Sequence, residues 1–107
     1  MAWTASGTTI RMSEGDYGVA LPFSLKGFTV AAEDSVKFEF KGEPNGTVIL
    51  TKDYSNIQNN AVNLVFTAAE SALFKPGVYC YNMAWYKDGY FQYFVIENGA
   101  FKVGDVA

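Results

Sequence analysis

The chain has 107 residues, half of them hydrophobic, which suits a single domain that buries a core without disulfides or metals. Its formal net charge is −3 and its eight basic residues are scattered, which argues against nucleic acid, since that partner needs a concentrated basic face. One cysteine and no histidine rule out an intrachain disulfide and remove the usual acid/base and metal ligand. We therefore expect one domain over residues 1–107, without enzymatic activity, cofactor or metal.

The first twelve residues, MAWTASGTTIRM, contain neither the basic nor the apolar region of a signal peptide. No apolar run approaches the ~20 residues that a membrane helix requires. The sequence therefore predicts synthesis in the cytoplasm of the producing cell and no membrane partner. A route out of the cell that needs no signal peptide, such as inclusion in a virus particle, stays open.

Alternation with a period of two residues runs through most of the chain, and helical periodicity is almost absent. The clearest strand is residues 35–41, where Val36, Phe38 and Phe40 alternate with charged side chains. Pro22 cannot donate a ladder hydrogen bond, which favours an edge or a bulge for its strand. In chain order, the eight predicted strands are residues 10–13, 21–26, 35–41, 47–53 and 62–66, a hairpin within 78–96, and residues 100–106.

One helical segment and two tight turns complete the prediction. Residues 67–74, TAAESALF, offer Thr67 as an N-cap and Glu70 at the third helical position. Asp88-Gly89 is a strong two-residue type I′ turn signal, and Asn98-Gly99 predicts a second tight turn before the last strand. The chain is thus predicted to be all-β, an antiparallel, immunoglobulin-like β-sandwich of about eight strands with one short helical turn near residues 67–75.

Candidate chemistry outside the aromatic residues is weak. Cys80 lies in a hydrophobic strand, which favours a buried, inert thiol. Glu14 and Asp16 flank a glycine, but two carboxylates are too few for a calcium ion, which takes six or more oxygens. Glu33 and Asp34 precede a strand and are expected in a solvated turn. No catalytic, cofactor-binding or metal-binding residues are predicted.

The segment YCYNMAWYKDGYFQYF, residues 79–94, has aromatic side chains at eight of its sixteen positions. A two-residue turn at Asp88-Gly89 pairs Lys87 with Tyr90 and Tyr86 with Phe91, and alternation then sorts the hairpin into two faces. One face is predicted to point inward and to carry Ile96 as well as five residues of the core. These five are Tyr79, Tyr81, Met83, Trp85 and Phe94.

The other face should meet water, yet apart from Asn82 it is apolar. It carries Cys80, Ala84, Tyr86, Phe91, Tyr93 and Val95. Such a patch usually marks a covered or contacted surface, and three explanations stay open: cover by other segments of the chain, a protein partner, or sugar rings stacking on the aromatic residues. The predicted interface is Ala84, Tyr86, Tyr90, Phe91, Tyr93 and Val95. A carbohydrate-binding module using these exposed aromatic residues is the alternative function.

The order of motifs resembles the N-terminal domain of phage baseplate upper proteins, a family of Firmicute phage tail proteins. That family shows a basic residue and a Gly-Asp turn before a Phe-x-Leu strand, then a leucine, Gly-x-Tyr-x-Tyr, a glycine and Phe-x-Val. The matching residues here are Arg11, Gly15, Asp16, Phe23, Leu25, Leu73, Gly77, Tyr79, Tyr81, Gly99, Phe101 and Val103.

The resemblance implies a non-enzymatic structural component of a phage or prophage tail or baseplate, located in the virion. Its partners would be other copies of itself, as a homo-oligomer, or other tail subunits. Family members usually continue into longer tail segments, so a small stand-alone component, an excised domain and an unrelated sandwich all stay open. Tyr79, which follows Leu73 and Gly77, also matches the tyrosine corner of Greek-key sandwiches, and its hydroxyl is predicted to bond to nearby backbone.

Overall fold

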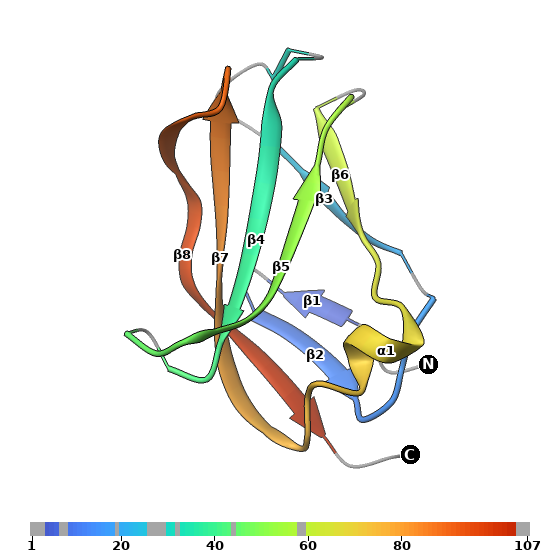
Figure 1. The fold of residues 1–107 in the computed structure, drawn as a ribbon. Coiled ribbons are helices and arrows are strands. Elements are labelled where there is room, and N and C mark those ends of the chain that lie inside the picture. The colour runs from blue at the N-terminus through green and yellow to red at the C-terminus, as the bar shows by residue number, and fades with distance from the viewer. Residues whose placement is uncertain are drawn as a thin grey trace.

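The computed structural model describes residues 4–6, 9–18, 20–25, 30–31, 33–43, 45–57 and 60–104. These residues form strands and one short helix, which confirms the predicted all-β sandwich (Figure 1). Lys26 and residues 105–106, which two predicted strands included, lie outside this part. The elements are β1 (Thr4–Ser6), β2 (Thr9–Ser13), β3 (Leu21–Ser24), β4 (Ser35–Lys41), β5 (Val48–Tyr54), β6 (Ala61–Leu64), α1 (Ala68–Ser71), β7 (Gly77–Lys87) and β8 (Tyr90–Gly104).

The strands form a six-stranded sheet in the order β1-β2-β8-β7-β4-β5 and a two-stranded sheet of β3 and β6. Adjacent β8, β7 and β4 correspond to the G-F-C order of immunoglobulin-like sandwiches, β5 to C′, and β3 with β6 to the B–E pair. One pairing departs from the antiparallel prediction, because β2 runs parallel to β8. These strands are far apart in sequence, so no hairpin turn dictates their relative direction.

No helix in the described part is long and apolar enough to cross a bilayer.

The core lies between the two sheets and is rich in aromatic rings. Val36, Phe38 and Phe40 on β4 are fully buried. On β7, Met83 is also fully buried and the Tyr81 side chain is 1% exposed. Phe23 of β3 packs edge-to-face on Phe38, with ring centroids 5.3 Å apart, which joins the sheets. Tyr79 and Trp85 are partly buried against this core. The alternation in the sequence therefore places the interior correctly along β4 and most of β7.

Strand β8 is continuous where the sequence predicted a turn at Asn98-Gly99. Tyr81 pairs with Gly99 and Met83 with Ile96, so one residue of β7 faces two residues of β8. This is a β-bulge, which inserts an extra residue without ending the strand. Asn98 takes a positive φ of 53°, and its N–H donates to Asn82 Oδ1 at 2.7 Å. The predicted turn is wrong because the Asn-Gly pair builds a bulge that a side chain of β7 satisfies.

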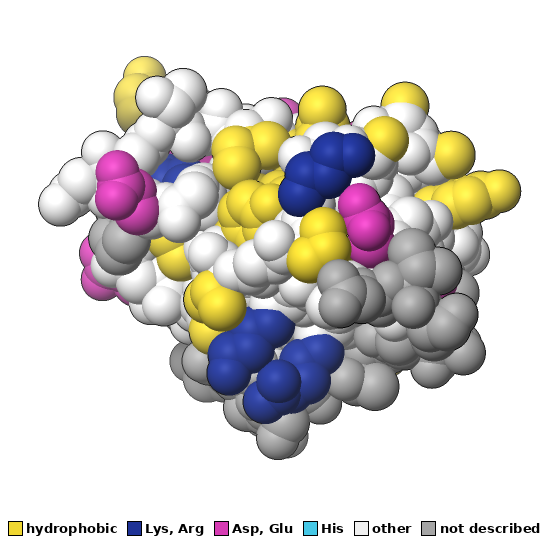
Figure 2. Space-filling view, turned by 90° about the horizontal axis from the view of Figure 1, so that it is seen from below, with side chains coloured by type: hydrophobic (Ala, Val, Ile, Leu, Met, Phe, Trp, Pro, Cys, Tyr) yellow, Lys and Arg dark blue, Asp and Glu magenta, His cyan; other side chains and the backbone are white. Residues whose placement is uncertain are grey.

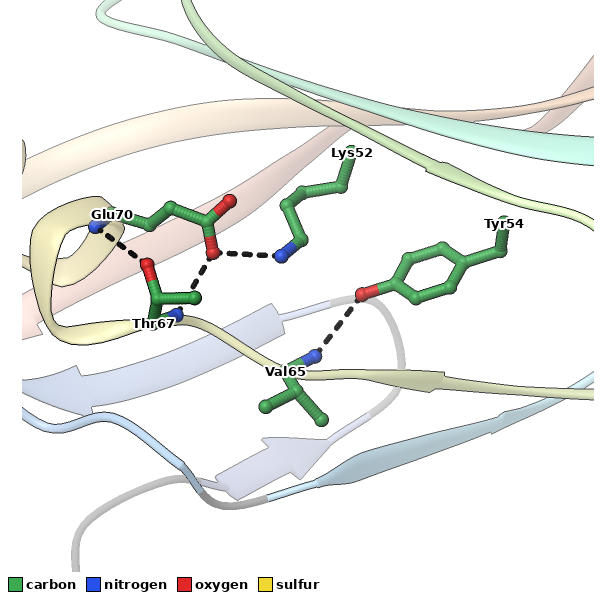
Figure 3. A network of polar contacts seen from close by, with 5 residues as sticks. All are labelled: Lys52, Tyr54, Val65, Thr67 and Glu70. Atoms are coloured by element: carbon green, nitrogen blue, oxygen red, sulfur yellow. Dashed lines mark hydrogen bonds and ion pairs between the residues drawn. The ribbon is translucent and has the colours of Figure 1, made fainter.

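Helix α1 begins with the predicted capping box. Thr67 Oγ1 accepts from Glu70 N–H at 3.2 Å, and Glu70 Oε1 accepts from Thr67 N–H at 2.8 Å. The same Glu70 oxygen lies 2.7 Å from Lys52 Nζ of β5, so one carboxylate joins the helix to the large sheet (Figure 3). Burial by itself would raise the pKa of Glu70. The Lys52 ammonium and the Thr67 N–H outweigh burial and hold that pKa below its ordinary value.

The predicted tyrosine corner is present at the start of β7. Tyr79 Oη donates to the carbonyl oxygen of Lys75 at 2.7 Å and accepts from the Lys75 N–H at 3.0 Å. The Tyr79 ring packs edge-to-face on Phe74, with centroids 5.1 Å apart. The hydroxyl thus closes the connection between α1 and β7 while the ring anchors it to the core.

Changing Tyr79 to Phe should lower the free energy of unfolding by about 1 to 1.5 kcal/mol, because it removes a hydroxyl that both donates and accepts. Urea denaturation followed by fluorescence measures the change. Tyr90→Phe is the matched control, since the Tyr90 side chain is 75% exposed, and it should leave the stability unchanged. Equal effects of the two substitutions would contradict a stabilising role for the corner.

The Glu70 carboxylate should make stability depend on pH. A group whose folded pKa is lowered stabilises the fold above its unfolded pKa, near 4.5, and loses that contribution as pH falls through the folded pKa. Between about pH 5 and pH 3, wild type should therefore lose more stability than Glu70→Gln, whose amide oxygen can still cap Thr67. Lys52→Met should weaken the same pH dependence. Urea midpoints across this range that coincide for wild type and Glu70→Gln would contradict the prediction.

Candidate functional site

The hairpin of β7 and β8 lies at the end of the sandwich opposite α1 (Figure 1). Asp88 and Gly89 both take positive φ, 52° and 80°, as a type I′ turn requires. Lys87 pairs with Tyr90 and Tyr86 with Phe91, in the predicted register. The sequence therefore places the tip of the hairpin correctly.

The register changes just beyond the tip, because β8 contains further bulges. Trp85 pairs with Tyr93, and Ala84 pairs with Phe94, so Gln92 is an extra residue. The prediction that Phe94 belongs to the core is therefore wrong: cross-strand partners share a face, and Phe94 is 38% exposed on the outer side. Tyr93, predicted on the outer face, is paired with inward-facing Trp85, and its side chain lies outside what the structure describes.

Two further members of the predicted interface are not exposed on this surface. Val95 is an extra residue between the Ala84–Phe94 and Met83–Ile96 pairs, and it packs against the core. Ala84 is only 5% exposed, since small side chains in a sheet lie below their longer neighbours. Tyr90 is 75% exposed but shares a face with Lys87, on the other side of the ribbon. The predicted apolar face is therefore smaller than the alternation indicated.

What remains is a group of three aromatic residues, Tyr86, Phe91 and Phe94, called here the hairpin aromatic patch. Phe91 is 48% exposed and Phe94 38%, while Tyr86 is partly buried. The rings of Tyr86 and Phe91 meet at 5.8 Å and 73°, and those of Phe91 and Phe94 at 5.0 Å and 62°. The edge-to-face contacts hold the rings in one cluster.

A cation borders this patch. Lys37 Nζ of β4 lies 4.9 Å from the centroid of the Tyr86 ring, a cation–π distance. Lys37 pairs with Ala84 across β4 and β7, which positions its side chain beside the rings. The candidate site is thus an apolar, aromatic surface with a positive charge at its margin.

A buried carboxylate fixes the base of the hairpin. Trp85 Nε1–H donates to Asp34 Oδ2 at 3.0 Å, and the Ala31 N–H donates to the same oxygen at 3.1 Å. Lys87 Nζ lies 3.9 Å from Asp34 Oδ1, and the Asp34 side chain is fully buried. These contacts connect Asp34, the residue before β4, to two residues on one face of β7, so the base of the hairpin is anchored to the neighbouring strand.

The environment of Asp34 favours its charged form. Burial alone would raise its pKa, but the hydrogen bonds from Ala31 and Trp85 and the charge of Lys87 together lower the pKa below its ordinary value. The expectation that Asp34 lies in a solvated turn is wrong, because its side chain is fully buried and two of its three partners, Trp85 and Lys87, lie some fifty positions away. The sequence did contain a signal for this contact. Trp85 lies on the predicted inner face, and a buried indole N–H requires a polar partner.

Cys80 is buried at 8% exposure on the same outer face, as the sequence predicted. Burial raises the pKa of its thiol, and this effect outweighs the lowering by Lys41. The thiol therefore stays protonated at neutral pH and is a poor nucleophile.

A second surface feature lies at the opposite end of the sandwich. Arg11 and Lys102 face each other across β2 and β8 and line a groove of about 350 Å³ together with exposed Val78. Figure 2, which looks at this end, shows adjacent basic side chains and apolar ones scattered among polar groups. None of the described residues that line this groove is aromatic, in contrast to the hairpin aromatic patch.

Comparisons with protein-family models, with curated proteins and with solved structures find no match for this chain. The chemistry of the site must therefore be read from its own residues. A rigid cluster of exposed rings beside a lysine can bury apolar area and stack against a partner surface.

The corrected register predicts which hairpin residues tolerate charge. Phe94→Lys should change the free energy of unfolding by no more than about 1 kcal/mol, because that side chain is on the outer surface. Ile96→Lys should cost about 3 kcal/mol or more, because Ile96 packs against the core. Chemical denaturation of both variants measures the contrast, and a loss at Phe94 as large as the loss at Ile96 would contradict the bulged register.

Proposed function

We propose that the protein is a non-enzymatic docking domain that binds a protein surface through the hairpin aromatic patch. The observation that carries this proposal is the exposure of Phe91 and Phe94, at 48% and 38%, on an anchored hairpin. Aromatic residues are enriched at protein interfaces, where one ring buries a large apolar area at low entropic cost. Both self-association and docking to a different protein use this chemistry.

The anchoring of the hairpin supports the proposal. Binding costs less free energy when the surface is already ordered, and the Asp34 contacts with Trp85 and Lys87 order the base of β7. Lys37 over the Tyr86 ring adds a charge that favours a partner with a carboxylate near its apolar contact. The patch is thus both apolar and preorganised.

The proposed setting is a phage or prophage tail or baseplate, where the domain would be a structural component of the virion. This part of the proposal rests on the order of motifs in the sequence. Several of the matching residues have structural positions: Tyr81, Phe101 and Val103 are buried in the core, and Tyr79 forms the tyrosine corner. The resemblance therefore bears on the domain type, while the patch is a feature of this chain.

A carbohydrate-binding module remains the alternative function, and the ring geometry favours it less. Stacking on a sugar needs an open ring face, whereas Phe91 meets Tyr86 and Phe94 at 73° and 62°. The three rings therefore do not form a coplanar platform. Tyr90 offers a free ring, but it lies on the other side of the ribbon.

The proposal is tested by site-specific photocrosslinking with p-benzoylphenylalanine placed at Phe91 during expression in the producing cell. We expect a defined crosslinked protein, either a second copy of this chain or another subunit, because the patch is buried in the assembly. The control position is Tyr17, which is 61% exposed away from the patch and should give no discrete product. The substitution Phe94→Lys should abolish the product at position 91 by placing a charge in the apolar contact.

Sedimentation of the purified protein separates the two modes of docking. A monomer that shifts to a dimer with concentration, and reverts with Phe94→Lys, identifies self-association. A glycan array that gives Phe91-dependent binding, together with no protein crosslink at Phe91, would replace docking by the carbohydrate function.

A further inference from the structure

The smaller sheet is incomplete beside β6. In immunoglobulin-like sandwiches the strand order of this sheet is A-B-E-D, so another strand lies next to E. Here β3 and β6 correspond to B and E, and no strand of the described part lies on the outer side of β6. A β-strand without a neighbour on one side presents unpaired backbone groups.

The direction of these groups along β6 follows from three hydrogen bonds. Asn60 C=O accepts from the Leu25 N–H at 2.7 Å, and Phe66 C=O accepts from the Gly18 N–H at 2.9 Å. The backbone N–H and C=O groups of the even-numbered residues in this segment therefore point toward β3, because alternate residues of a strand direct these groups to the same side. Val65 agrees, because its N–H donates instead to Tyr54 Oη of β5 at 3.2 Å (Figure 3).

Ala61 and Asn63 thus direct their N–H and C=O groups away from β3. Within the described residues these groups have no hydrogen-bond partner. They are two residues apart, about 7 Å along the strand, which is the spacing at which another extended strand offers its own donors and acceptors. The hydroxyl of Tyr54 satisfies the next outward N–H, that of Val65.

The other edge of the smaller sheet, along β3, contains a proline that hinders strand addition. Pro22 of β3 pairs with Asn63 across the sheet, so its backbone also points outward, on the far side of β3. Proline has no N–H to donate, and proline on an edge strand is a usual defence against strand addition. Strand β6 carries no proline, so strand addition at β6 meets no such obstacle.

A groove lies along this free edge. Its volume is about 410 Å³, and the described residues that line it are uncharged: Tyr54, Ser55, Asn56, Ile57, Ala61, Val62 and Asn63. Residues 54–57 and 61–63 line the groove together, so a strand added at the outward groups of Ala61 and Asn63 would lie between these two segments. We propose that the free edge of β6 binds an extended, uncharged peptide segment of another protein, which adds to β3 and β6 as a third strand. This site is separate from the hairpin aromatic patch.

The experiment is amide hydrogen exchange followed by NMR on the full chain. In the free protein the Ala61 and Asn63 amides should exchange much faster than those of Val62 and Leu64. The probe is a capped seven-residue peptide of alternating threonine and valine, which has no charge and high strand propensity. At about nine times its dissociation constant, exchange at Ala61 and Asn63 should slow about tenfold, with no change at Phe91.

Two controls separate strand addition from other binding. The same peptide with alternate backbone nitrogens methylated cannot form the ladder and should leave exchange unchanged. Asn63→Pro removes one outward N–H and should abolish the slowing, whereas Asn63→Thr keeps the N–H and should retain it. The preceding residue, Val62, is extended, so it accommodates proline at position 63.

Three results would overturn the proposal. Ala61 and Asn63 amides as protected as Val62 in the free, monomeric protein would show that the edge is already occupied. Protection that rises with protein concentration alone would assign the edge to a second copy. Shifts confined to Phe91 and Phe94 on adding the peptide, or none at millimolar peptide, would show that β6 does not add a strand.

Discussion

The packing around Phe40 is the interaction on which the rest of the fold depends. Its fully buried ring lies 5.2 Å from Phe101 of β8 and 5.3 Å from Phe66, which follows β6. It also lies 5.8 Å from both Tyr81 of β7 and Phe74 after α1. One residue of β4 therefore holds together three strands of the large sheet and the connection from the small sheet. A two-stranded sheet covers little area, and this dense aromatic core supplies burial that missing strands would otherwise provide.

The bulges of β8 determine which side chains reach solvent. Each extra residue exchanges the faces of the positions that follow it, so Phe94 is brought outward beside Phe91. The bulge at Gln92 is the one that exposes Phe94. At a separate bulge further along β8, Asn82 Oδ1 accepts the Asn98 N–H that leaves the ladder, so the polar residue in an otherwise apolar face is part of the backbone pairing.

Sequence patterns that relate residues close together in the chain predicted most of the fold. The alternation of β4, the type I′ turn at Asp88-Gly89 and the capping box of Thr67 and Glu70 each involve residues at most a few positions apart. The errors have different origins. The parallel pairing of β2 with β8 and the burial of Asp34 against Trp85 depend on contacts between distant segments. The register of Phe94 depends on a bulge in β8, which regular alternation does not predict. Of the six residues of the predicted interface, only Tyr86 and Phe91 therefore belong to the hairpin aromatic patch, although the tip of the hairpin was correctly predicted.

The two candidate surfaces differ in how the chain treats its exposed groups. Pro22 removes one N–H from the β3 edge of the small sheet, and Tyr54 accepts the backbone N–H of Val65, just after β6. Both features limit strand addition. Ala61 and Asn63 receive no such cover within the described residues. The rings of the hairpin aromatic patch likewise stay exposed although a shift of one residue in β8 would have turned Phe94 inward. Exposed apolar rings and unpaired strand edges both carry a risk of aggregation, and a fold that controls one edge while leaving another free is consistent with surfaces that partners cover in an assembly.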